Sequence, residues 1–184
     1  MTSSHTHHQL TLTVPRAELP RFNALFQRGV GTRAAAGSSV YGFLTGELGL
    51  AADYVRGRIT TVFLDGQVVD ALEDAALRGG SLLALSAAMP GLVGATLRRN
   101  GPYAVMRAAI TRTADRTPQE ARGGTIVIRL KLFNLLLEEM GPVLLERGMV
   151  LDRGDVLDVL GDRAEALTDL PAGGKVELTV RVSG

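Results

Sequence analysis

The chain contains 184 residues, of which 46% are hydrophobic and 21% charged, and its formal net charge is +1. This composition supplies enough apolar side chains for the core of one domain and is not that of a disordered chain. The chain has no cysteine and only 4% aromatic residues. These two features exclude disulfides, thiolate metal sites and cysteine nucleophiles, and they disfavour nucleic-acid binding by base stacking.

The uncharged segments of the chain give no sign of export or membrane insertion. Residues 1–8 are polar and lack the apolar core of a secretory signal. The uncharged stretch over residues 81–97 contains Pro90-Gly91 and is shorter than the about 20 residues of a spanning helix. We therefore expect a soluble cytoplasmic protein with no membrane partner, and the absence of cysteine fits a reducing compartment.

The first elements are expected between residues 8 and 37. Residues 1–7 are predicted to form a disordered tail, and the alternation over residues 9–14 predicts a half-buried strand. Leucines and phenylalanines recur at helical spacing over residues 18–27, so a helix is expected there. The residues from 29 to 37 are rich in Gly and Ala, which predicts a loop.

The segment from Ser39 to Gly94 has the punctuation of one compact supersecondary unit. Ser39 is a helix N-cap residue and Gly49 a stop signal, so a helix is expected between them. A strand over residues 59–64 then reaches the turn Asp65-Gly66, which is followed by a short apolar pair and an acidic linker. The turn at residues 78–80 leads into a second apolar strand over residues 82–85.

This order resembles the later part of the ThiS/MoaD-type sulfur carriers, small proteins of the β-grasp (ubiquitin-like) fold. In those carriers a helix, a strand, two glycine turns and a last strand precede a Gly-Gly tail that is adenylated and thiocarboxylated. The resemblance covers about residues 39–94 and implies a mixed sheet that grasps a helix and serves as a binding module. Residues 91–94 contain no adjacent glycine pair, and the chain ends in Ser183-Gly184. The resemblance therefore leaves Gly184 as the candidate carrier terminus.

The middle of the chain gives a weaker pattern. Pro90 suits the first turn of a helix whose inner face would contain Leu92, Val93, Thr96 and Leu97. Residues 103–110 are apolar and compatible with either a strand or a helix. Residues 113–124 combine a proline, polar residues and two glycines, which predicts a linker.

The C-terminal part predicts two further strands and a helix. Strict alternation over residues 126–132 and 175–182 indicates strands, and residues 133–147 have helical spacing with Pro142 as a kink. Residues 156–167 are mixed. Residues 11–30 resemble residues 127–149, and residues 77–86 resemble residues 170–180, so an internal duplication is one interpretation.

Together these elements predict an α+β fold. We expect a β-grasp-like mixed sheet packed on helices, with a C-terminal strand–helix–strand extension. The predicted organisation is a tail over residues 1–7, a β-grasp-like unit with an insertion over residues 8–112, the linker, and a C-terminal α+β segment over residues 125–184 that packs on the first unit.

The residues that carry chemistry are sparse. His5, His7 and His8 are the only imidazoles and lie in or beside the predicted tail, so nucleophile–base catalysis with histidine is not expected in the folded part. Asp155, Asp158 and Asp162 would share one helix face, either as a cation site or as a solvated acidic face. The second interpretation is preferred, so we predict no catalytic residue, no metal ion and no cofactor.

One loop and one charge asymmetry complete the candidate features. Met89, Pro90, Gly91 and Gly94 could let backbone N–H groups approach an anion, or could reflect close strand–helix packing. Residues 98–131 carry eight basic and two acidic residues, whereas residues 132–174 carry nine acidic and three basic ones. Matching of opposite charges, within one subunit or between two, is preferred to nucleic-acid binding.

The sequence thus favours a non-enzymatic cytoplasmic binding or assembly protein. Its partner would be another protein or a second copy of the chain, because residues 81–97 supply more apolar surface than a small core needs. The alternative is a sulfur-carrier-like or accessory protein of molybdopterin- or thiamine-type cofactor biosynthesis.

Overall fold

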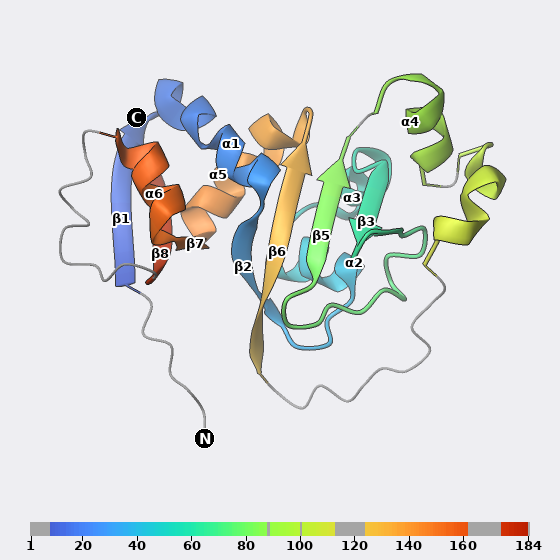
Figure 1. The fold of residues 1–184 in the computed structure, drawn as a ribbon, viewed down its shortest axis with the longest axis horizontal. Helices are drawn as coiled ribbons and strands as arrows, with labels where there is room; N and C mark the ends of the chain where they lie inside the picture. Colours follow the sequence, from blue (N-terminus) through green and yellow to red (C-terminus); the bar gives the residue numbers. More distant parts are fainter. Residues whose placement is uncertain (1–7, 88, 100, 113–123, 162–173, 184) are drawn as a thin grey trace.

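A computed structural model describes residues 8–87, 89–99, 101–112, 124–161 and 174–183. One mixed eight-stranded sheet runs through the protein, with the strand order β1-β8-β7-β2-β6-β5-β3-β4. Helices pack against it, so the fold is α+β as predicted (Figure 1). The strands are β1 (His8–Pro15), β2 (Val30–Ala35), β3 (Thr61–Leu64), β4 (Gln67–Val68), β5 (Leu82–Ser86), β6 (Thr125–Phe133), β7 (Met149–Asp152) and β8 (Lys175–Ser183).

The two ends of the described chain form one side of the sheet. β1 pairs in parallel with β8 from His8 opposite Val176 to Pro15 opposite Ser183. β8 continues antiparallel to β7. Both terminal strands were predicted from their alternation, and in β8 the side chains of Val176, Leu178 and Val180 are buried.

A strand from the C-terminal segment lies in the middle of the sheet. β6 pairs antiparallel to β2 and parallel to β5, and Ile128, Leu130 and Leu132 are buried in the core as their alternation predicted. The two predicted segments therefore share one sheet. Residues 113–123 of the predicted linker lie outside the described residues.

The prediction of a loop over residues 29–37 is wrong, because Val30–Ala35 form β2. Val30, Thr32 and Ala34 are buried on one face of this strand. On the other face, a Cβ atom at Gly31 would lie 2.6 Å from the carbonyl oxygen of Val150. This close approach of β2 and β7 requires a residue without a side chain at Gly31. Because the segment is rich in such small residues, its sequence lacks the alternation of large apolar residues by which strands are recognised.

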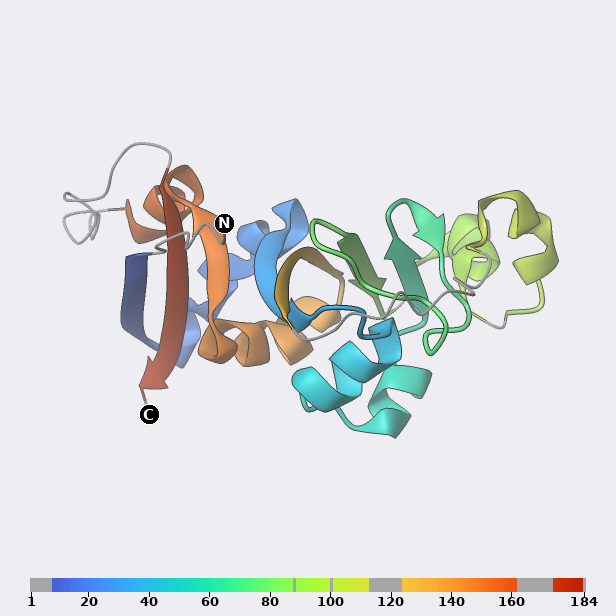
Figure 2. The same ribbon diagram turned by 90° about the horizontal axis from the view of Figure 1, so that it is seen from below.

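The predicted helix after Ser39 is confirmed as a short α-helical turn, α2 (Val40–Gly42), and a wider π-helical turn, η2 (Phe43–Glu47). The Ser39 hydroxyl accepts a hydrogen bond from the Gly42 N–H at 3.0 Å, which is the capping contact expected of this residue. Gly49 follows with φ of 70°. Figure 2 shows α2 and the next helix, α3 (Ala52–Gly57), on one side of the strands β5 and β3.

The remaining helices are η1 (Arg16–Phe22), α1 (Asn23–Arg28), α4 (Gly91–Leu97), the 3₁₀ segment η3 (Ala104–Ile110), α5 (Leu136–Arg147) and α6 (Arg153–Leu160). α5 contains Pro142 and packs closely on α1, where Gly141 faces the ring of Phe26. One continuous hydrophobic cluster fills the space between the helices and the sheet.

The predicted inner face of α4 is wrong. Leu92 and Val93 are 67% and 66% exposed, and the buried residue of the helix is Gly94. α4 and η3 extend beyond the sheet at the end of the molecule opposite β1 (Figures 1 and 2). The large side chains at the start of this helix therefore lie outside the core.

Candidate binding surface

The segment from Met89 to Arg112 presents a cluster of exposed apolar side chains, here named the α4–η3 surface. Seven of the nine large hydrophobic residues exposed in the described part of the chain belong to this segment. They are Met89, Leu92, Val93, Tyr103, Val105, Met106 and Ile110. The exposed fraction reaches 83% at Val105 and 71% at Met106. Single exposed hydrophobic residues are common in soluble proteins, but clusters of them usually mark interaction sites.

A buried arginine holds this segment together. The Arg107 side chain is 1% exposed and its guanidinium donates five hydrogen bonds. Two go to the carboxylate of Asp70, at 2.7 and 2.9 Å, and the others to the Thr96 and Arg98 carbonyls and the Thr111 hydroxyl. Five donors with five acceptors satisfy the guanidinium completely. The apolar side chains are therefore exposed on a well-connected segment.

A second attachment joins the end of η3 to the β3–β4 hairpin. The Arg112 N–H donates to the Val68 carbonyl at 2.8 Å, and the Arg112 guanidinium forms an ion pair with Asp65 at 3.6 Å. Asp65 and Gly66 have φ of 52° and 82°, the left-handed values of the tight hairpin turn that this dipeptide predicted.

Arg99 attaches the middle of the segment, just after α4, to α3. Its Nε and Nη2 atoms donate to the carbonyls of Ile59 and Val55, at 3.2 and 3.1 Å. These carbonyls lie at and just beyond the C-terminal end of α3, where backbone acceptors lack helical partners. Burial lowers the pKa of the Arg99 guanidinium, since the low-dielectric surroundings disfavour its charge.

Two pockets adjoin α4, one at each end of the helix. One has a volume of about 300 Å³ and is lined by Arg56, Gly57, Thr60, Arg98 and Arg99; we name it the arginine pocket. The other has a volume of about 250 Å³, and its lining is mainly apolar, including Phe63, Ala84, Met89, Pro90 and Phe133. A cationic and an apolar recess thus adjoin the same exposed segment.

The four residues predicted as an anion-binding loop lie at the start of α4. A Cβ atom at Gly94 would lie 1.9 Å from the Met89 carbonyl oxygen, and Gly91 has φ of 76°. Pro90 precedes the helix and has no side-chain capping contact. Gly94 is thus required by the close contact with Met89, which is the packing explanation of the loop. α4 has seven residues, too few to argue for an anion site at its N-terminus.

Of the other candidate residues, those that the structure describes lie on α6 and β1, at the end of the sheet away from α4 (Figure 1). Asp155 and Asp158 both form ion pairs with Arg28, at 3.3 and 3.0 Å. Within the described residues, no three His, Cys, Asp or Glu side chains form a group that could hold a metal ion. His8 lies in β1, whereas His5, His7, Asp162 and Gly184 lie outside the described residues.

The basic and acidic segments are not joined to one another by the ion pairs that the structure shows. Arg107 and Arg112 pair with Asp70 and Asp65, which precede the basic segment. On the acidic side, Glu139 pairs with Arg58 and the carboxylates of α6 pair with Arg28. These pairs join both charged segments to residues of the N-terminal half, whereas Asp152 of the acidic segment pairs with Lys175 of β8.

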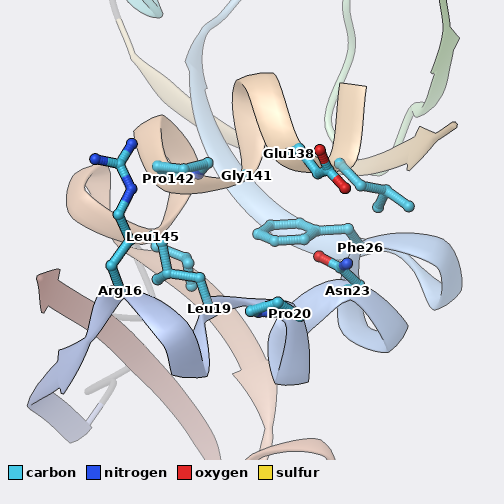
Figure 3. Close-up of a pocket in the computed structure, with 10 residues that line it drawn as sticks. Arg16, Leu19, Pro20, Asn23, Phe26, Glu138, Gly141, Pro142 and Leu145 are labelled. Carbon is cyan, nitrogen blue, oxygen red and sulfur yellow. The ribbon is translucent and has the colours of Figure 1, made fainter. Parts of the chain in front are cut away.

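A further pocket lies between η1, α1 and α5 (Figure 3). It has a volume of about 310 Å³ and an apolar floor that includes Phe26 and Leu145. The close-up shows Arg16 and Glu138 at opposite ends of the rim, with Asn23 beside Phe26. The floor belongs to the main hydrophobic core, so the pocket is a surface depression over the packing of α1 on α5.

The sequence reasoning identified the apolar run of residues 81–97 but missed the exposed residues of η3. A signal was present: the chain contains no Asp or Glu between Asp74 and Asp115. A long stretch without carboxylates can lie in the core or at an interface, and only the structure distinguishes the two.

The chain was compared with protein-family models, curated proteins and solved structures, and none of them matches it. None of the helices in the described part of the chain has the length and apolar character needed to cross a membrane.

Proposed function

We propose that this protein is a non-enzymatic binding or assembly protein of β-grasp-like fold that acts through the α4–η3 surface. The observation that carries the proposal is the cluster of seven exposed apolar side chains on one attached segment. Exposing such a cluster to water is unfavourable, and a partner that covers it would recover about 25 cal/mol for each Å² of apolar surface removed.

The way the segment is held supports a preformed surface. Arg107 satisfies all its donors within the protein, and Arg99 and Arg112 attach the middle and the C-terminal end of the segment. A preformed surface loses less conformational entropy on binding than a flexible one. Binding of a partner protein that covers the α4–η3 surface is therefore the function that the geometry supports best.

The β-grasp-like part of the proposal is supported by residues 39–86. They fold in the order expected from the resemblance: helical turns, the strand β3, the Asp65-Gly66 turn, β4, and the last strand β5. Helices α2 and α3 lie against one side of these strands (Figure 2). A carrier-like role is the second candidate, because the sulfur carriers have this same order of elements.

A photo-crosslinking amino acid at Val105 tests the binding function in cells that express the protein. Discrete adducts are expected from Val105, the most exposed of the seven apolar residues, and not from the exposed Thr13 on β1, at the other end of the molecule. Equal crosslinking from both positions would contradict the proposal. Intact-mass measurement after incubation with a sulfur-carrier-activating enzyme and ATP tests the second candidate, since an adenylate or thiocarboxylate would change the mass of the chain.

A further inference from the structure

We infer that the partner of the α4–η3 surface is a protein segment with apolar side chains flanked by carboxylates, and that the arginine pocket binds one of these carboxylates. This inference rests on the proposed function and specifies the chemistry of its partner. It follows from the charges around the apolar side chains, from the geometry of the pocket, and from the consequences of pairing two copies of the same surface.

The charge on this segment has one sign. Residues 89–112 contain Arg98, Arg99, Arg107 and Arg112 and no carboxylate. Arg107 and Arg112 are paired with Asp70 and Asp65. Across the described part of the chain, no carboxylate lies within ion-pair distance of Arg98 or Arg99. Among the described residues, Arg98 and Arg99 therefore have no directly paired carboxylate, and both lie next to the exposed apolar side chains.

The arginine pocket gathers these two cations with a third. Arg99 uses its Nε and Nη2 groups on backbone carbonyls, so neutral acceptors hold it in place, and Glu73 and Asp70 act on its charge only from beyond ion-pair distance. Arg98 is exposed at the rim. Arg56 forms a 3.4 Å ion pair with Glu73 in which both side chains are more than half exposed, and such pairs are weak. A carboxylate in this pocket would meet guanidinium donors arranged for charge-assisted hydrogen bonds.

The charge distribution also decides between a second copy and a different protein. A two-fold contact would place the same patch on both sides of the interface. The second copy would then bring the same arginines and no carboxylate from its own residues 89–112. Like charges facing each other cost several kcal/mol across an interface. An acidic partner would supply carboxylates for these arginines, whereas a second copy would add further positive charge.

The test uses three synthetic helical peptides of about 18 residues, long enough to form a helix on binding. All carry leucines at helical i, i+3, i+4 and i+7 spacing, and their flanking positions are glutamate, glutamine or lysine. Binding of each labelled peptide to the full chain is measured by fluorescence anisotropy. The glutamate peptide is expected to bind about tenfold more tightly than the glutamine peptide, and the lysine peptide is expected to bind most weakly.

Variants of the protein locate the effect. Arg98→Gln removes an exposed cation of the pocket and should abolish most of the glutamate preference, while Arg98→Glu should invert it towards the lysine peptide. Arg16→Gln, which removes an exposed arginine at the opposite end of the molecule, is the matched control and should leave the preference unchanged. Circular dichroism of each variant verifies that the fold is intact.

Different results would contradict the acidic partner and the proposed binding function. Equal binding of the glutamate and glutamine peptides, reduced by Leu92→Ser, would overturn the acidic partner and keep the binding surface. No binding of any peptide would overturn both. A protein that co-sediments with phosphatidylglycerol vesicles through Arg98 but ignores the glutamate peptide would also overturn the inference, because the pocket would then recognise a lipid headgroup.

Discussion

Arg107 and Asp70 form a two-point ion pair in which only one partner is fully buried. The guanidinium donates to both carboxylate oxygens, at 2.9 and 2.7 Å, and the side chains are 1% and 31% exposed. Asp70 lies two residues after β4, and Arg107 lies in η3. This pair therefore connects the α4–η3 surface to the edge of the sheet, where the strand order ends at β4.

Replacing Arg107 by Met should destabilise the protein by about 3 kcal/mol, because it breaks a buried pair and leaves backbone carbonyls without donors. Urea unfolding measures the loss. Arg16→Met removes an exposed arginine and should change the free energy of unfolding by less than about 0.5 kcal/mol. Equal stability of the two variants would show that the Arg107 contacts do not hold the segment.

Gly31→Ala should weaken the junction between β2 and β7. The added Cβ atom would lie 2.6 Å from the Val150 carbonyl, so one strand must move at the Gly31–Val150 pair. We expect a loss of about 1–3 kcal/mol, the usual cost of overpacking, measured by thermal unfolding. Gly79→Ala is the control, since its nearest contact is 3.9 Å away and its φ is not in the left-handed region. A Gly31→Ala variant as stable as Gly79→Ala would contradict the close approach.

The elements that the sequence predicted well are those whose pattern depends on burial on one face. β6 and β8 alternate over their full length, so a period of two residues is visible without any tertiary information. The turn at Asp65-Gly66 and the N-cap at Ser39 follow from local stereochemistry and are confirmed. β2 was missed because the glycine in it, Gly31, is required by close contact with Val150. Val150 lies about 120 residues later in the chain, so the sequence around β2 contains no sign of this contact.

The surface was harder to predict for the opposite reason. Leu92 and Val93 suit the inner face of a helix, but the domain ends before it can cover them. A sequence pattern shows which residues are apolar. It does not show whether they face the core, and the assumption that they do fails for Leu92 and Val93. Arg107 also gave no signal, since a buried arginine is indistinguishable in sequence from an exposed one until Asp70 is placed beside it.

Replacing Thr32 by Val should stabilise the protein by about 1 kcal/mol. The Thr32 side chain is buried in β2, and its hydroxyl has no hydrogen-bond partner among the described residues. Valine keeps the shape and removes the cost of a buried unpaired hydroxyl. Thr32→Ala is the control, because it also removes the hydroxyl but leaves a small cavity. Chemical unfolding that ranks Val below Thr would show that the hydroxyl is satisfied.

Stability should fall in acid partly through Glu139. A hydrogen bond from Arg58 lowers the pKa of this carboxyl group, with a further contribution from the Tyr54 hydroxyl, which donates at 2.7 Å. Below the ordinary pKa of glutamate, about 4.3, the unfolded chain takes up the proton before the native protein does. The free energy of unfolding therefore decreases as the pH falls through this range and is fully retained above it.

Urea unfolding between about pH 6 and pH 3 measures this slope. Glu139→Gln should give a shallower decrease than the wild type because the titrating group is gone. Glu138→Gln removes the neighbouring carboxylate, which has no hydrogen bond or ion pair among the described residues, and should keep the wild-type slope. Identical slopes for all three proteins would contradict a lowered pKa at Glu139.

The exposed apolar cluster should bind a hydrophobic dye in the native state. Val105 and Met106 lie next to each other and are 83% and 71% exposed, so the double variant Val105→Ser, Met106→Ser should reduce the fluorescence of the dye ANS. Its free energy of unfolding should stay within about 0.5 kcal/mol of the wild type, since neither side chain contributes to the core. Leu135→Ser is the matched control, because Leu135 is 47% exposed but lies outside the cluster. If Leu135→Ser reduces the fluorescence as much as the double variant does, the dye reports scattered apolar residues rather than one surface.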